Sequence, residues 1–325
     1  MRSALAALGL ALLAQPPAPA VAEPALVYSV GGKFDASFNE SAWIGAEAWK
    51  AQTGGSYGEF EIDSPAQSEQ ALRNFARKGF SPVVAIGFMH ADALARVAPD
   101  YPDTEFAIID MVVEAPNVQS VVYREQEGAY VVGVMAALAS ETGKIGFVGG
   151  MDIPLIRRFA CGYAQGVASV AEEDEVFVAV TGDTPAAWAD PARGAELARA
   201  QIDRGADVVM QAAGGTGTGV LQAVADAGVL GIGTDSNQNG LHPGHVLTSM
   251  LKRVDVAVLQ AFSAWRPGVT SLGLAEGGVA YAMDAHNAAL VTPEIEAAAK
   301  RAVAQITSGE VKVIDSAEPG GCPFL

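Results

Sequence analysis

The feature that most constrains the fold is a regular alternation of short apolar runs with longer helical patterns. In the first part of the chain, helical patterns at residues 41–52, 64–78 and 90–98 are interleaved with strand-like runs at 25–30, 59–62, 82–86, 105–109 and 118–122. Strands and helices that take turns in this way are typical of a parallel sheet covered by helices on both faces. The sequence therefore predicts an α/β protein.

The same pattern then restarts. Helices at 127–140, 155–171, 191–204 and 218–227 alternate with strands at 144–148, 176–181, 207–211 and 230–233. The remainder, with helices at 256–265 and 292–308 and two strand-like pieces, is too short for a third domain. We predict two doubly wound parallel-sheet lobes joined by a hinge, able to close around a ligand. The predicted parts are 23–122 with 253–270 (first lobe), 123–252 with 271–315 (second lobe) and 316–325 (C-terminal tail).

The first 22 residues have the pattern of a cleaved signal peptide. Arg2 precedes an uncharged apolar run at 4–14, and Ala20-Val21-Ala22 fits a small-residue cleavage site. The apolar run is shorter than the roughly 20 residues of a membrane span. No cysteine stands at the cleavage point to carry a lipid. We therefore expect a periplasmic protein without a lipid anchor; the alternative is a disordered start on a cytoplasmic protein.

The charge balance disfavours two classes of partner. Removing residues 1–22 from the 325-residue chain leaves 303 residues, with 19 Lys and Arg against 37 Asp and Glu, a net charge of −18. A chain of this length suggests about two domains. Its negative charge disfavours nucleic acid and anionic membrane surfaces as partners.

The two cysteines leave two alternatives open. Cys161 falls in a predicted helix and Cys322 in a Gly/Pro-rich tail. In an exported protein they can form a disulfide that ties the tail to the body. Otherwise, both are free thiols. The four histidines have no repeated spacing and there is no CxxC, so we expect no metal site.

Aromatic, acidic and amide side chains gather where predicted strands end. In doubly wound sheets, ligands bind outside the carboxyl ends of the strands. An aromatic ring from each lobe can sandwich a flat heterocycle, a carboxylate can accept from vicinal hydroxyls, and an amide can read a base edge. This set suits a neutral polar ligand better than a phosphate. Its members are Phe38, Asn39, Asp110, Trp188 and Asp235.

Each of these residues also has a simpler explanation. Asp110 can cap a turn, Phe38 can belong to the core, and Asp235 can form an Asx-turn with the residues that follow it. Lys252, after an apolar run, can be a solvated lysine. Trp188 lies in a polar, proline-containing segment, where a core role is less natural. The joint placement of these residues at strand ends is what favours a binding site.

The sequence offers no catalytic motif. The glycine-rich segment 214–219 joins a strand to a helix, but it lacks the Lys-Ser/Thr that ends a phosphate-binding P-loop. We interpret it as a tight turn beside the cleft. No GxSxG, HExxH or Ser–His–Asp set is recognisable. We therefore expect a binding protein that is not an enzyme and has no cofactor.

Taken together, the motifs resemble those of a known family. In chain order they are GGKFDASFNESAWIG, FAIID, YREQEGAYVVGVMAALAS, GKIGFVGGMDIPLI, RFACGYAQG, DPARG, QAAGGTGTGV, GIGTDSNQ and LTSMLKRVDVAV. This order resembles the basic membrane protein (BMP) family of ABC-transporter substrate-binding proteins, which includes bacterial purine nucleoside receptors. The resemblance covers almost the whole chain after the signal peptide.

The resemblance implies a type I periplasmic-binding fold and a nucleoside, with a purine nucleoside as the expected ligand, that is delivered to an ABC permease. It implies that Phe38, with Asn39 beside it, stacks on the base, and that Trp188 closes on the base from the other lobe. We expect a monomer. Alternative functions are binding of a sugar or free base, sensory signalling, and nucleoside hydrolysis.

The resemblance also assigns the charged residues. Asp110 contacts the ligand, while Asp235 and Lys252 hold the ribose hydroxyls. The sequence departs from the family at Ser29, where many members carry an aspartate that reads the base, and at Trp188, where phenylalanine is usual. It also lacks the lipid-carrying cysteine. The first two departures bear on which base is bound.

Overall fold

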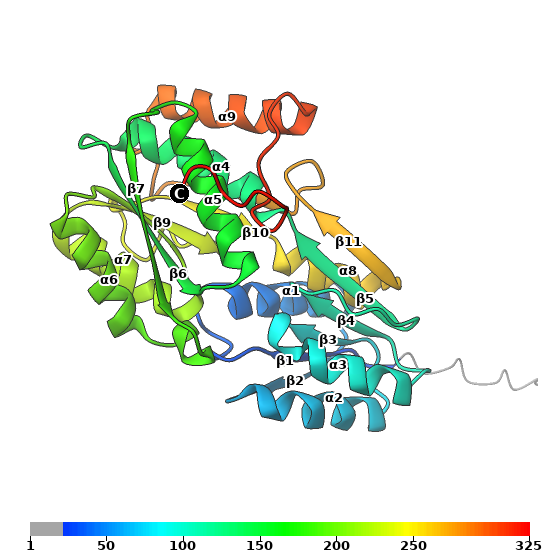
Figure 1. Cartoon of the computed structure of the whole chain (residues 1–325). Coiled ribbons are helices and arrows are strands. Elements are labelled where there is room, and N and C mark those ends of the chain that lie inside the picture. The colour runs from blue at the N-terminus through cyan, green and yellow to red at the C-terminus, as the bar shows by residue number, and fades with distance from the viewer. Residues whose placement is uncertain (1–21) are drawn as a thin grey trace, which may run out of the picture.

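The computed structural model describes residues 22–325 and contains two six-stranded sheets, one in each of two lobes (Figure 1). The predicted signal peptide lies outside the described residues, except for Ala22. The first sheet is wholly parallel, in the order β11-β5-β4-β3-β1-β2. Its strands are β1 (Ala25–Tyr28), β2 (Gly58–Glu61), β3 (Val83–Ile86), β4 (Phe106–Ile109), β5 (Val118–Tyr123) and β11 (Gly268–Leu272).

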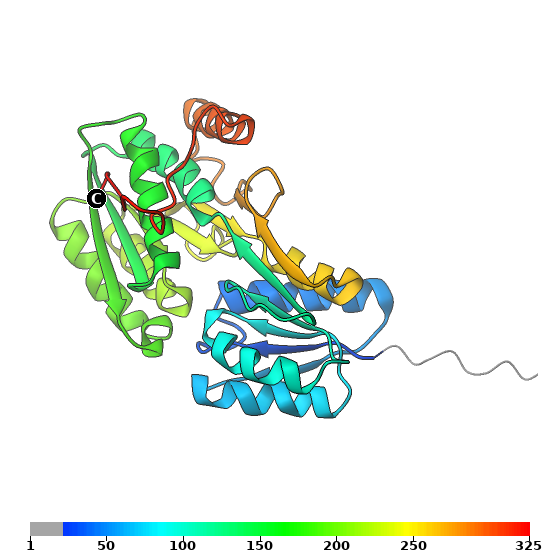
Figure 2. The same cartoon turned by 45° about the vertical axis from the view of Figure 1, so that its right-hand side comes forward.

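Helices cover both faces of the first sheet. In Figures 1 and 2, α1 (Phe38–Thr53) and α8 (Val254–Ala264) lie on one face, and α2 (Ser68–Arg77) and α3 (Ala91–Val97) lie on the other. All residues of β1, β3 and β4 are buried. Central parallel strands covered on both faces read as continuous apolar runs, which is why these segments stand out in the sequence.

The second sheet repeats this arrangement, with the order β12-β10-β9-β8-β6-β7. Its strands are β6 (Lys144–Met151), β7 (Glu175–Gly182), β8 (Val208–Ala212), β9 (Leu230–Asp235), β10 (Val246–Lys252) and β12 (Val279–Tyr281), the last antiparallel to β10. The helices of this lobe are α4 (Glu125–Ala139), α5 (Pro154–Ala168), α6 (Pro191–Asp203), α7 (Gly217–Ala227) and α9 (Pro293–Ser308).

The two lobes therefore share one topology. In each, the second strand of the lobe flanks the first on one side, and the third, fourth and fifth follow on the other. This is the doubly wound order in which the chain reverses direction beside the first strand. The prediction of two doubly wound parallel-sheet lobes is confirmed. The boundary predicted between residues 270 and 271 falls inside β11, because that strand continues its pairing with β5 as far as Leu272.

Three crossings of the chain between the lobes form the hinge. They follow β5, β10 and β11, and hydrogen bonds tie them together. Arg124 N donates to Leu272 O at 2.9 Å, and Arg253 N donates to Gly278 O at 2.9 Å. Tyr123 Oη donates to Arg253 O at 3.2 Å. Three hydrogen-bonded crossings are the arrangement of a hinge between two lobes.

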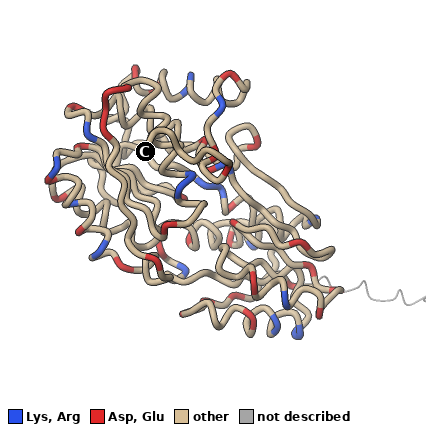
Figure 3. The backbone as a smooth tube through the Cα atoms, in the orientation of Figure 1, with Lys and Arg blue, Asp and Glu red and all other residues tan. Residues whose placement is uncertain are grey.

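The chain ends against the second lobe. Cys161 in α5 and Cys322 near the C-terminus form a disulfide, so the structure selects the bridged one of the two alternatives. No helix within residues 22–325 is long and apolar enough to cross a membrane. Figure 3 shows Asp and Glu in both lobes, with Lys and Arg interspersed among them.

Candidate functional site

A cavity lies between the two lobes. Its volume is about 60 Å³, several times the roughly 10–15 Å³ that a single water needs. It therefore has room for several water molecules. The structure brings all seven residues singled out from the sequence to its wall: Ser29, Phe38, Asn39, Asp110, Trp188, Asp235 and Lys252.

The topology explains why these residues meet. Ser29 and Gly87 directly follow β1 and β3, the two strands between which the winding of the first sheet reverses. Gly214 comes shortly after β8, which flanks the corresponding reversal in the second sheet. All three line the cavity. The cavity therefore lies at the switch points of both lobes, where doubly wound folds bind ligands.

The elements that carry the aromatic and amide residues differ in detail from prediction. Phe38 and Asn39 were expected in a loop, but they form the first turn of α1. The helix starts early because Asp35 accepts hydrogen bonds from the backbone N–H groups of Ser37, Asn39 and Glu40, at 2.8–3.1 Å. A side chain that satisfies the free N–H groups of a first turn stabilises the helix start.

Asn39 is less available than predicted. Its Nδ2 donates to the backbone oxygens of Ser29 and Gly32, at 3.2 and 3.0 Å, and its Oδ1 accepts from Ser29 N at 3.1 Å. Both amide protons are therefore used to hold the loop after β1. Because both Nδ2 protons are used, Asn39 can offer a base edge only an acceptor, the remaining lone pair of Oδ1, and not the donor that was also predicted.

Lys252 is the centre of a buried charged cluster. It ends β10, and its side chain is only 1% exposed. Its Nζ lies 2.6 Å from the Asp110 carboxylate and 3.1 Å from Glu125 Oε1. The rings of Phe38 and Tyr123 lie 5.3 and 5.0 Å from the same nitrogen, within range of a cation–π contact. The interpretation of Lys252 as a solvated lysine is wrong.

The pKa values of this cluster are set by burial and mutual charge. Burial raises the pKa of Asp110, Glu125 and Asp235, while the charge of Lys252 opposes that rise. Burial alone would lower the pKa of Lys252, but the three carboxylates outweigh it and raise the pKa above its usual value. Lys252 therefore stays protonated at neutral pH.

Asp235 ends β9 and bonds across the cleft rather than to Lys252. Its Oδ2 accepts from Ser37 Oγ at 2.7 Å. Ser236 Oγ donates to Ser37 O at 2.7 Å, and Gln238 Nε2 donates to Ala36 O at 2.9 Å. These bonds join the loop before α1 to the end of β9. They join the two lobes beside Asp235, which itself lines the cavity.

Asp110 and Asp235 share an unusual backbone conformation. Each has a φ of +69°, in the left-handed region. Non-glycine residues are uncommon there, and when they occur at the ends of strands beside a cleft they are often functional. The common conformation aims both carboxylates from strand ends toward the same cavity.

Trp188 lies flat on the second sheet. It ends a short 3₁₀ helix (Pro185–Trp188), and a Cβ added to Gly150 would come within 2.5–2.8 Å of three atoms of its six-membered ring. Gly150, predicted to follow a strand, is inside β6. Only a residue without a side chain at position 150 lets the indole pack this closely. Among the described residues, the buried Nε1 of Trp188 has no hydrogen-bond partner.

Three residues in or beside the cavity wall were not predicted from the sequence. Phe88 lies just after β3, and its ring centroid is 6.3 Å from that of Trp188 in an edge contact. It was not among the residues predicted to bind the ligand. Asp35 lines the cavity, and burial raises its pKa to about 7. Glu125 starts α4 beside the hinge. An acid in the first turn of a helix usually complements the helix dipole, so Glu125 could not be distinguished from an ordinary helix-start acid.

The chain is similar to known proteins over most of its length. Residues 23–313 match the family model of the PnrA-like ABC transporter substrate-binding proteins, Bmp. The chain belongs to the Bmp family of ABC transporter substrate-binding proteins. The resemblance seen in the sequence motifs is thereby confirmed, and the family is one of solute-binding proteins that act outside the cytoplasm.

Individual relatives agree with the family. The "ABC transporter nucleoside-binding protein BmpA" of Lactococcus lactis is 33% identical over 318 residues, covering 89% of this chain and 88% of that protein. An uncharacterized lipoprotein of Pyrococcus furiosus is 35% identical over 277 residues, covering 79% and 69%. A solute-binding protein of an ABC transporter system from Aeropyrum pernix K1 superposes with a TM-score of 0.81 at 30% identity, covering 90% and 93%. The type I periplasmic-binding fold of the Bmp family is therefore that of this chain.

The family membership fixes the general chemistry. A substrate-binding protein of an ABC system takes a small molecule and meets a permease. Among the residues that the structure describes, no group of three or more His, Cys, Asp and Glu is arranged to hold a metal ion. The wall of the cavity in this Bmp protein combines aromatic rings, aliphatic side chains, carboxylates and a paired lysine.

Proposed function

We propose that this protein binds a nucleoside, with a purine as the first candidate, in the interlobe cavity and delivers it to an ABC permease. The observation that carries the proposal is the composition of one cavity wall: aromatic rings from both lobes stand beside a buried lysine and two strand-end carboxylates. Aromatic faces suit a flat base, and paired charges with free lone pairs suit the hydroxyls of a sugar. A nucleoside joins these two chemistries in one molecule.

The base end of the ligand is assigned to the aromatic residues. Phe38 and Phe88 of the first lobe and Trp188 of the second line the cavity. Trp188 also has a buried indole N–H that lacks a partner within the described part of the chain. A buried donor without a partner is costly, so an acceptor atom on the ligand would be favoured there.

The sugar end is assigned to Asp110, Asp235 and Lys252. Asp110 and Lys252 already pair with each other at 2.6 Å, which leaves Asp235 as a wall carboxylate without a lysine partner at hydrogen-bond distance among the described residues. Asp235 has one oxygen engaged by Ser37, and the other is free to accept from a hydroxyl. Because these contacts come from both lobes, a bound ligand would stabilise the closed form, which is the form a permease recognises.

We further propose export to the periplasm with cleavage near Ala22, action as a monomer and no catalysis. Catalysis would need a nucleophile or general base aimed at the glycosidic bond. The wall lysine is paired with two carboxylates, and both oxygens of Asp35 already accept from the backbone N–H groups at the start of α1. The relative BmpA is named as nucleoside-binding, which supports the ligand class proposed here.

Ser29 favours a second candidate, a free base or sugar. At this position the family often places an aspartate, whereas the serine offers only a hydroxyl, and its backbone N–H and C=O are bonded to Asn39. A thermal-shift screen across nucleosides, free bases and sugars separates the two candidates. The nucleoside proposal predicts the largest stabilisation from a nucleoside.

Asp235→Ala tests the site directly. Isothermal titration with the nucleoside found in the screen should show affinity at least about tenfold weaker, since a lost hydrogen bond to a charged group costs roughly 1.5–3 kcal/mol. Asp226→Ala is the matched control, because Asp226 is exposed on α7 and its side chain accepts a bond from Gln222, away from the cavity. Unchanged affinity in Asp235→Ala would remove Asp235 from the site.

A further inference from the structure

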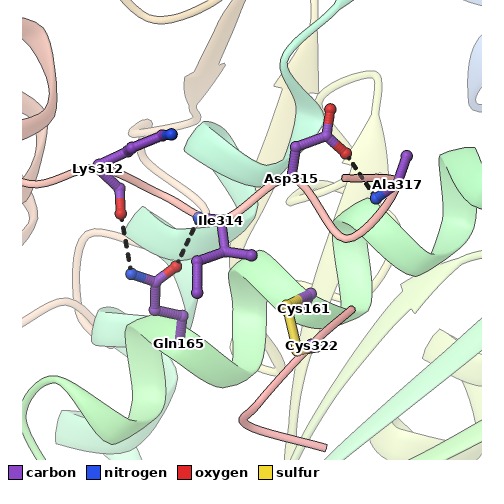
Figure 4. The surroundings of a disulfide bond; sticks show 7 residues. All are labelled: Cys161, Gln165, Lys312, Ile314, Asp315, Ala317 and Cys322. Carbon is purple, nitrogen blue, oxygen red and sulfur yellow. Dashed lines mark hydrogen bonds between the residues drawn. A yellow bond between two sulfur atoms is a disulfide. The ribbon is translucent and has the colours of Figure 1, made fainter. Parts of the chain in front are cut away.

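The C-terminal strap, residues 310–325, is fastened to one face of α5. Gln165 Nε2 donates to Lys312 O at 3.2 Å, and Gln165 Oε1 accepts from Ile314 N at 2.9 Å. Arg158 Nε donates to Asp315 Oδ1 at 3.0 Å, and Cys161 is disulfide-bonded to Cys322. Figure 4 shows the Gln165 and Cys161 attachments along the same helix.

The spacing of these attachments places them on one side of the helix. Residues 158, 161 and 165 are separated by three and four positions, which aligns their side chains along one face. Leu155, Ile156 and Phe159, on a neighbouring face, line the ligand cavity. One helix therefore touches the strap on one side and the cavity on another.

Arg158 connects these two sides by charge. Its Nη1 lies 3.6 Å from Oε2 of Glu125, and Oε1 of Glu125 receives Lys252 at 3.1 Å. Glu125 is only 1% exposed, and within residues 22–325 its Oε2 has no hydrogen-bond partner apart from this ion pair. An ionic path thus runs from Asp315 in the strap through Arg158 and Glu125 to Lys252.

We propose that Arg158 is a positioning residue for Lys252, and that the disulfide-anchored strap holds Arg158 in this role. The charged groups that face Glu125 are Lys252 on β10, Asp110 after β4, Arg158 on α5 and Asp235 at the end of β9. Burial raises the pKa of Glu125, while Lys252 and Arg158 lower it. Without Arg158, Glu125 takes up a proton at a higher pH. Lys252 then loses one of its two anionic partners and shifts toward Asp110.

The consequence for binding rests on the proposed role of Lys252 at the sugar end of the ligand. When Glu125 is ionised, the ammonium is shared between two carboxylates and held at a fixed place in the wall. When Glu125 is neutral, the ammonium follows Asp110 alone. Release of the strap thus weakens ligand binding without any change to a residue that touches the ligand.

The test uses the titration of Glu125 in the ligand-free, oxidised protein, followed by ¹³C NMR of labelled glutamate carboxyls and assigned with Glu125→Gln. Arg158→Gln should move the titration midpoint up by about one pH unit. Asp315→Asn and Cys322→Ser should move it in the same direction by a smaller amount. Arg157→Gln is the matched control, since Arg157 is the neighbouring arginine of α5, is exposed and pairs with Asp152 instead.

An unchanged Glu125 midpoint in Arg158→Gln overturns the role of Arg158. If Arg158→Gln moves the midpoint but both Asp315→Asn and Cys322→Ser leave it unchanged, the role of the strap is overturned. A second measurement, calorimetric titration with inosine at pH 7.5, should show about fivefold weaker binding in Arg158→Gln. Failure of the wild type to bind any nucleoside defeats the proposed function alone, because the Glu125 titration needs no ligand.

Discussion

Replacement of Lys252 by methionine removes the only cation that, in the described part of the chain, lies within 3.2 Å of the Asp110 and Glu125 carboxylates. Methionine keeps the length of the apolar stem, so the change is mainly one of charge. Both carboxylates are buried, and so is Asp235 nearby. Truncation of one partner of a buried ion pair costs about 3–5 kcal/mol, because the remaining charge is left uncompensated. In a chain of this size that corresponds to a fall in Tm of roughly 6–10 °C.

The loss should depend on pH in a defined direction. Burial raises the pKa of Asp110, Glu125 and Asp235 above their unfolded values, and loss of Lys252 raises them further. At pH values between the unfolded and the folded pKa values of these three carboxyls, the folded variant therefore binds more protons than the unfolded chain. Its stability therefore falls as pH rises through that window. The Tm difference between Lys252→Met and wild type should be larger at pH 8 than at pH 5.

Lys300→Met provides the matched control, since Lys300 is 65% exposed on α9 and pairs with Glu296 at the surface. An exposed pair contributes about 0.3–0.5 kcal/mol, so this Tm should hardly move. Thermal unfolding followed by circular dichroism at both pH values measures all three proteins. The reasoning is refuted if Lys252→Met is no less stable than Lys300→Met, or if its deficit grows as pH falls.

Two other predictions concern the packing of Gly150 in the second lobe and the titration of His90 in the first. Gly150→Ala places a methyl group 2.5 Å from the Trp188 ring. This overpacking should lower the free energy of unfolding by about 1–3 kcal/mol. It should also change the tryptophan fluorescence and weaken nucleoside binding. Gly182→Ala, whose Cβ would come no closer than 3.6 Å to Ala187, should leave both unchanged, and equal effects of the two substitutions would contradict the packing argument. Burial lowers the pKa of His90 from 6.5 to about 4. Between these two pH values the unfolded chain binds a proton that the folded chain does not. The free energy of unfolding should therefore rise by up to about 3 kcal/mol between pH 4 and 6.5. His90→Gln should flatten that rise in urea unfolding at several pH values, and an unaltered slope would exclude His90 as its source.

The sequence predicted the fold well because both lobes are built from strands buried on two faces. Such strands read as continuous apolar runs, and the helices between them show their own period. The ends of elements were less accurate. The helix of α1 was expected from residue 41, but the cap formed by Asp35 starts it at Phe38. Capping of this kind depends on the path of a loop, which the apolar pattern does not reveal.

The walls of the cavity were predicted from the rule that ligands bind at strand ends, and all seven chosen residues reach the cavity. Their partners were not predictable in the same way. Lys252 pairs with Glu125, 127 positions earlier, and Asp235 bonds Ser37, 198 positions earlier. Contacts over such separations depend on how the two lobes close. The pairing of Cys161 with Cys322 depends likewise on the path of the strap over α5.

The most direct test of the central claim compares a nucleoside with its two halves. Isothermal titration of the mature, ligand-free protein with inosine or adenosine should give a micromolar or tighter Kd, about −8 kcal/mol or better. Ribose and the free base should each bind at least roughly a hundredfold more weakly, because each engages only the charged or only the aromatic part of the wall. The claim is contradicted if no nucleoside binds, or if ribose or a base alone binds as tightly as the whole molecule.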